Sequence, residues 1–358
     1  MGNDGGTMGA SSLPTMPASV WSRFVDLPSL ASTLAPATTE VDGVEDFIMS
    51  FIGWTLMWAA LFYFLSYTVP QWAGAAPNST KDHENDRYWM ARNLLGVIHA
   101  IFVTAITVPG FFLLSDAPDK VRFGSTGQLA TCAATTAVLR PEEIEAWGFL
   151  CQAVALAGLV FTSFTVADVG ICIMHGLASA DFIAHHIAFI TAGLIIRSHC
   201  MLPFNATMLL AMEASTPFLN FILFFRHRGP AFKFAVQANG IIFVILFVVF
   251  RLILNTYGAI VLWLHYATAV APIVPKWQVW FLLIAVTAGV LVQFFWFPQV
   301  VRTFGAGLLE LMGRSNSARL DADGSSGSGN EGVYLLLSAG HTGSRSGGRE
   351  SGRQQCAQ

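Results

Sequence analysis

The residues best suited to chemistry form the run Asp181-Phe-Ile-Ala-His185-His186, which opens an otherwise apolar stretch. A charged side chain at membrane depth costs about 2.5 kcal/mol or more, so such groups usually mark a site. On a helix, Asp181 shares a face with His185, where a carboxylate can fix the imidazole tautomer and raise its basicity for proton transfer. His186 lies 100° further round and points elsewhere. The structural alternative is a packed histidine pair that bonds to helix carbonyls.

Two further apolar stretches carry ionisable groups. Arg92 and His99 are seven residues apart and share a helix face, and Asp168 follows a long apolar run. A lone carboxylate at that depth should point inward and pair with an arginine or a histidine. For Arg92 the alternative is that its long side chain reaches up to the lipid headgroups.

The segment Glu213-Ala-Ser-Thr216-Pro217-Phe-Leu-Asn220 places three polar residues on one stripe of an apolar helix. Pro217 cannot donate a hydrogen bond to the carbonyl of Glu213 and clashes with it, so the helix should break there. A break beside a carboxylate predicts a cavity wall formed by Glu213, Thr216 and Asn220.

Polar residues also occur in the apolar stretch that follows. Gln237, Arg251 and Asn255 share one face of a regular α-helix, whereas Asn239 is offset from it. Arg251 lies too deep to face lipid, and Glu213 or Asp168 is its expected partner. A structural ion pair and an anion or headgroup site remain alternatives for Arg251.

The elements that must position these groups are membrane spans. Of the 358 residues, 54% are hydrophobic and only 11% are charged, against about 25% charged in soluble proteins. This composition indicates an integral membrane protein, and the net charge of −3 does not favour nucleic-acid binding. Apolar stretches long enough to cross about 30 Å of hydrocarbon lie at 47–69, 90–114, 147–174, 182–200, 202–225, 234–264 and 277–301. A six-span alternative treats 182–200 as partly re-entrant.

The segments outside the spans indicate the domain boundaries and the orientation of the chain in the membrane. Residues 1–46 and 314–358 are rich in small polar residues and are predicted to be disordered tails around a transmembrane region at 47–313. More basic residues lie in the loops on the C-terminal side, so the C-terminus should be cytosolic and the N-terminus lumenal. The cysteines show no metal-binding spacing, so no metal site is predicted. A disulfide between Cys132 and Cys200 would require both to face the lumen.

The sequence resembles the TLC-domain family, which includes the ceramide synthases. The likeness covers about residues 87–302 and rests on four segments in order. These are Arg92-Asn-Leu-Leu-Gly-Val-Ile-His99, Asp181 with His185-His186, Glu213-Ala-Ser-Thr-Pro-Phe-Leu-Asn220, and Asn239-Gly240 followed by Phe250-Arg251.

The resemblance implies an all-α polytopic fold of about seven helices, six of them ringed around a central lipid cavity, in the endoplasmic reticulum. It implies acyl transfer with acyl-CoA as a co-substrate and no other cofactor. His185 or His186 would act as general base or transient acyl acceptor, oriented by Asp181 or Asp168. Glu213 stands where the ceramide synthases have an Asp pair, a form similar to the TLC branch without a settled activity. The residues expected to bind the lipid are Arg92, His99, Thr216, Asn220, Asn239 and Arg251.

Three functions stay open at this level. The first is a lipid-modifying enzyme that transfers or hydrolyses an acyl group of a membrane lipid. The second is a non-catalytic lipid-binding regulator of membrane composition. The third is a lipid transporter or trafficking receptor, which would carry a bound cargo instead of forming a lipid product.

Overall fold

The computed structural model describes residues 43–73, 82–117, 119–123, 141–199, 201–269 and 274–321. These residues form helices and connecting turns, with no β-strand among them. The Cys132–Cys200 pair lies outside the described residues, as do most of the N-terminal tail and the C-terminal tail after residue 321.

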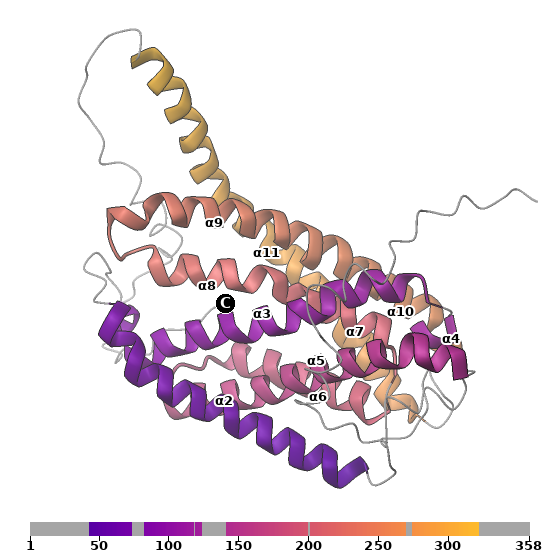
Figure 1. The fold of residues 1–358 in the computed structure, drawn as a ribbon. Coiled ribbons are helices and arrows are strands. Elements are labelled where there is room, and N and C mark those ends of the chain that lie inside the picture. Colours follow the sequence, from indigo (N-terminus) through magenta and orange to yellow (C-terminus); the bar gives the residue numbers. More distant parts are fainter. Residues whose placement is uncertain are drawn as a thin grey trace, which may run out of the picture. The chain divides into compact units, whose positions relative to one another are not determined.

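Seven helical segments of the described chain are long and apolar enough to cross a membrane, which confirms the all-α, seven-span fold. The fourth segment is one continuous helix that is long and apolar enough for a full span (Figure 1). The spans are α2 (Gly43–Ala73), α3 (Arg87–Ser115), α5 (Pro141–Met174), α6 (Ala180–Ser198), the fifth span α7–η4–α8 (Pro203–Leu210, Ala211–Ser215, Thr216–Phe225), the sixth span α9–η6–α10 (Lys233–Leu246, Phe247–Leu254, Asn255–Ala269) and α11 (Lys276–Asp321). Short helices η2 (Asp82–Asn85), α4 (Asp119–Arg122) and η5 (Pro230–Phe232) lie between them.

The start of α6 is fixed by its own sequence. The Ser179 hydroxyl accepts a hydrogen bond from the Phe182 backbone N–H, which satisfies one of the unpaired donors at the helix start. Arg197 lies in the last turn, where a cation interacts favourably with the helix dipole. The histidine pair therefore lies between one and two turns inside the span.

Two spans depart from regular α-helix. In the fifth span the 3₁₀ segment η4 ends at Ser215, just before Pro217, which confirms the expected break. In the sixth span η6 is a π-helix, which the sequence analysis did not predict. A π-helix has more residues per turn than an α-helix, so Gln237 and Asn255 no longer share the face that a regular helix would give them.

Helix α3 packs against α2, α5 and both helical parts of the fifth span. Helix α6 packs on α5, and the sixth span packs along α11 (Figure 1). This arrangement brings the second, third and fourth spans together around the histidine pair.

A buried ion cluster ties two connecting segments together outside the spans. Glu84, only 2% exposed, accepts hydrogen bonds from Arg226 Nη2 at 2.6 Å and from His227 Nδ1 at 2.5 Å. Arg228 donates to the Ala73 carbonyl at 3.1 Å. Burial lowers the pKa of the Arg228 guanidinium from its ordinary value, and the nearby Glu84 charge opposes that shift. The cluster holds η2 against the turn between α8 and α9.

Candidate functional site

Asp168 of α5 is the centre of a buried charge cluster. Arg92 of α3 binds it through two hydrogen bonds, Nε to Oδ1 at 2.8 Å and Nη2 to Oδ2 at 3.0 Å. His186 of α6 places Nε2 at 3.2 Å from Oδ2. Asp168 is 2% exposed and Arg92 is 9% exposed. The expectation that Asp168 points inward and pairs with an arginine or a histidine is confirmed, and Arg92 does not extend to the headgroups.

His186 is held at both ring nitrogens. Its Nδ1 lies 3.0 Å from the Phe182 carbonyl oxygen, while Nε2 faces Asp168. Both neighbours are oxygens that only accept hydrogen bonds, so each contact is made by an N–H of the ring where that nitrogen carries a proton. The Arg92 guanidinium also lies 4.9 Å from the centre of the Phe182 ring. His186 therefore joins α6 to α5, and both of its ring nitrogens already face oxygen atoms of the protein.

His185 has the opposite environment. Its ring centre is 5.6 Å from that of His186, with the planes at 67°, and 4.6 Å from the Phe189 ring. The side chain is exposed and lines an apolar cavity between the helices. Within that part of the chain His185 makes ring contacts and no side-chain hydrogen bond. Its nitrogens are therefore open to a molecule in the cavity.

Asp181 is linked to His185 by charge alone. The carboxylate is exposed and forms its hydrogen bonds with Ser179 and with backbone N–H groups at the start of α6. Its negative charge still acts on the His185 ring. The helix start satisfies the carboxylate first, so the expected fixing of the His185 tautomer by Asp181 is not seen in the described residues.

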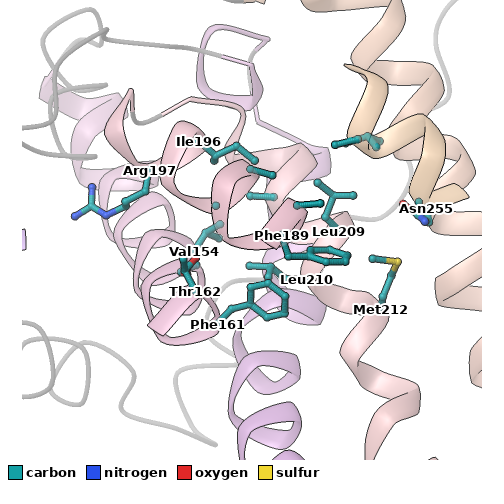
Figure 2. Close-up of a pocket in the computed structure, with 18 of the residues that line it drawn as sticks. Val154, Phe161, Thr162, Phe189, Ile196, Arg197, Leu209, Leu210, Met212 and Asn255 are labelled. Carbon is teal, nitrogen blue, oxygen red and sulfur yellow. The ribbon is translucent and has the colours of Figure 1, made fainter. Parts of the chain in front are cut away.

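The cavity has a volume of about 350 Å³, within the range of small-molecule sites. Its wall is almost entirely apolar and comes from the third to seventh spans. Five spans thus contribute, where the family resemblance implied a ring of six. Figure 2 shows Phe161, Phe189 and Leu210 near the middle, Met212 and Asn255 on one side, and Arg197 on the other with its guanidinium directed away.

Helix α6 supplies one long side of this wall. The lining residues His185, Phe189, Ile196 and Arg197 recur at helical spacing. From His185 to Arg197 the helix rises about 18 Å, so the cavity is elongated along the span. An elongated apolar chamber with an imidazole near one end suits the hydrocarbon chain of a lipid.

None of the six expected lipid-binding residues lines this cavity, and the wall expected from Glu213, Thr216 and Asn220 is formed by other residues. Three of the six have packing roles elsewhere in the bundle. His99 is 1% exposed and stacks on Phe164, with ring centres 3.8 Å apart. Asn220 is buried against Gly96 of α3, where an added Cβ would lie 2.8 Å from the Asn220 Nδ2. Asn239 donates to the Ala235 carbonyl of its own helix at 2.8 Å. These side chains pack the bundle in the structure, and a role in binding stays a prediction.

Arg251 forms a second polar group beside the cavity. Its Nε donates to the Ser215 hydroxyl at 2.8 Å and its Nη2 to the Thr216 hydroxyl at 3.0 Å. Glu213 acts on it through charge. The alternative partner Asp168 was wrong, because that carboxylate is bound by Arg92. Arg251 does not line the cavity itself, but its charge acts on His185, which does.

Two cavity residues were not among the expected site residues. Asn255 opens α10 and Gln293 lies in α11, and both side chains line the cavity. From the sequence, Asn255 was noted only for sharing a helix face with Arg251 and Gln237, and Gln293 was not singled out. The available signal was a lone amide in the middle of an apolar span, which is costly there without a partner. Among the described residues, no three His, Cys, Asp or Glu side chains lie close enough to hold a metal ion.

The chain matches a known protein family. The family model described as the TLC domain covers residues 45–302, which include every candidate residue above. A comparison with curated proteins gave no match.

Proposed function

The chain belongs to the TLC-domain family of integral membrane proteins, and from this premise we propose that it binds a membrane lipid in the cavity and uses His185 either to transfer an acyl group to that lipid or to hydrolyse one from it. One observation carries the proposal. Of two consecutive histidines, His186 is bound at both nitrogens, whereas His185 lines an apolar cavity with its nitrogens open.

In this reaction neutral His185 takes the proton from an attacking hydroxyl, amine or water as that group adds to the acyl carbonyl. The same imidazolium then returns the proton to the leaving group. For transfer the acyl donor is an acyl-CoA, and for hydrolysis the attacking group is water. The positive charge of Arg251, which acts on His185, favours the negative charge that develops on the carbonyl oxygen.

A second candidate is a lipid-binding regulator without catalysis. It is supported by the lack of any side-chain hydrogen bond between His185 and a carboxylate in the described residues. In that function the cavity would hold a lipid and His185 would supply only a polar contact.

Lipid profiles of cells that express matched variants separate these candidates. His185→Gln keeps a polar group of similar reach but cannot exchange a proton near neutral pH, while His185→Ala removes both. Ile187→Ala changes an exposed α6 residue outside the cavity wall and serves as the control.

An enzyme should lose its product with both His185 variants, at least about 100-fold for a missing general base, and keep it with Ile187→Ala. A regulator should keep the wild-type lipid profile with His185→Gln and lose it with His185→Ala. A wild-type profile with both His185 variants would contradict both candidates.

We also propose residence in the endoplasmic reticulum, with the N-terminus lumenal and the C-terminus cytosolic. The support is the family resemblance and the basic residues on the C-terminal side. The sequon at Asn78 then faces the cytosol and carries no glycan, so a glycan on Asn78 would contradict this topology.

A further inference from the structure

Two buried amides line the cavity with side-chain oxygens that have no hydrogen-bond partner in the described residues. Asn255 is 1% exposed and Gln293 is 3% exposed, and both belong to the cavity wall. The Asn255 Oδ1 and the Gln293 Oε1 are fully enclosed and accept no hydrogen bond in the described residues. The two residues come from α10 and α11, which pack against each other.

Such a pair needs an explanation because buried polar atoms in proteins are nearly always satisfied. Leaving an amide without a partner costs free energy that a leucine of similar size would not. The nearby buried Asn205 donates to the Gly258 carbonyl at 2.9 Å, although its own Oδ1 is enclosed without a partner too. Asn255 and Gln293 differ from Asn205 in that they line the cavity, where an occupant can supply a partner. The missing partner of Asn255 and Gln293 therefore belongs to whatever occupies the cavity.

The local structure directs Asn255 to this place. It follows the π-helix η6, whose Arg251 is anchored on Ser215 and Thr216. On α11 the other lining residues are Ala285, Val286, Ala288, Gly289 and Val292, all apolar. Gln293 is thus the one polar residue that α11 contributes to the wall.

We propose that Asn255 and Gln293 form a subsite for a neutral hydrogen-bonding group, a hydroxyl or a carboxamide, on a long-chain lipid in the cavity. Each side-chain amide offers an acceptor and two donors, which match a group that both donates and accepts. A phosphate or carboxylate brings a charge that amides do not neutralise. The subsite rests on the lipid-binding part of the proposed function and does not depend on catalysis.

A displacement assay on the purified full chain in detergent tests the subsite. A fluorescent long-chain acyl probe occupies the cavity, and the competitors are octadecan-1-ol, octadecanamide and nonadecane, in which a methyl replaces the hydroxyl. The variants are Asn255→Leu, Gln293→Leu and both together. Thr55→Val is the matched control, because Thr55 bonds to its own helix and lies outside the cavity wall.

For wild type and Thr55→Val, octadecan-1-ol and octadecanamide should displace the probe at concentrations about tenfold below that of nonadecane. In the double variant this preference should fall to nearly one. A given competitor partitions into the detergent micelles to the same extent whichever protein is present. Comparing the same competitor between wild type and variant therefore cancels the effect of partition.

Equal displacement by octadecan-1-ol and nonadecane in wild type would overturn the subsite, and this comparison does not depend on any variant folding. An unchanged preference in the double variant would overturn it as well. A probe that fails to bind wild type at all would remove the lipid cavity together with the subsite. Loss of catalysis alone, with the hydroxyl preference intact, would remove only the enzymatic part of the proposed function.

Discussion

His185 and His186 are consecutive residues of α6 whose ring centres lie 5.6 Å apart, yet only His186 is bonded to Asp168. His185 faces the cavity. A rotation of 100° about the helix axis thus separates a structural imidazole from one that is available to a ligand. Substitution of His186 should therefore mainly reduce stability, whereas substitution of His185 should mainly affect the ligand.

We expect His186→Ala to lower the free energy of unfolding by about 2 kcal/mol, because it removes a charge-assisted partner of a buried carboxylate. His185→Ala should change it by less than about 1 kcal/mol, since the side chain is exposed and makes only ring contacts. Thermal unfolding in detergent measures both. Equal destabilisation by the two variants would contradict the division of roles.

Asp168→Asn should destabilise the chain more severely. It leaves the buried Arg92 guanidinium without its carboxylate, which costs about 3–5 kcal/mol. Addition of Arg92→Met should recover part of that loss, because an unpaired buried charge is then removed. Melting temperatures of the single and double variants give the coupling, and strictly additive losses would show that the pair is not the cause.

Gly193→Ala should disturb the contact between α5 and α6. A Cβ at Gly193 would lie 2.3 Å from the Thr162 Oγ1, so one side chain must move at a cost of about 1–3 kcal/mol. Thr162→Ala should relieve the clash in the double variant. Gly158→Ala, also in the cavity wall but with nothing within 4 Å, is the control. A Gly193→Ala protein as stable as Gly158→Ala would argue against this close approach.

Glu84→Gln should loosen the segment before α3. Two of its neighbours, Arg226 and Arg228, then keep their charges without the buried carboxylate between them, at a cost of about 3–5 kcal/mol. Proteolysis of the membrane-embedded protein measures the opening of η2. Asp116→Asn, at the exposed end of α3, is the matched control and should leave the cleavage rate unchanged.

Asn255→Leu with Gln293→Leu should raise the melting temperature of lipid-free protein or leave it unchanged. Replacing unsatisfied buried amides by apolar groups of similar shape is neutral to stabilising. The same variant should gain less stability from octadecan-1-ol than wild type does. A clear loss of stability in lipid-free protein would mean that the amides already have partners there.

The sequence predicted the fold well because span length and apolar composition are local properties. All seven spans, the break before Pro217 and the inward pairing of Asp168 follow from residue spacing and from the cost of buried charge. Helical periodicity also separated His185 from His186. It did not show which of them faces the cavity, because that depends on how α6 is rotated against α5.

The side chains that pair between different helices were harder to predict from the sequence than the spans. Arg251 bonds to the hydroxyls of Ser215 and Thr216 because the break in the fifth span brings them within reach. The π-helix η6 changes the register between Gln237 and Asn255, and no proline or glycine in that segment signals it. The Asp181 carboxylate bonds to Ser179 and to backbone N–H groups at the start of α6, and so it does not bond to His185.

The central claim is that His185 faces a lipid-filled chamber formed by spans from both halves of the chain. A density map of the purified protein in lipid nanodiscs tests it most directly. We expect elongated density of an acyl chain between α6 and α11 that ends beside His185. A chamber closed by side chains, with the His185 imidazole directed into the bilayer, would contradict the account.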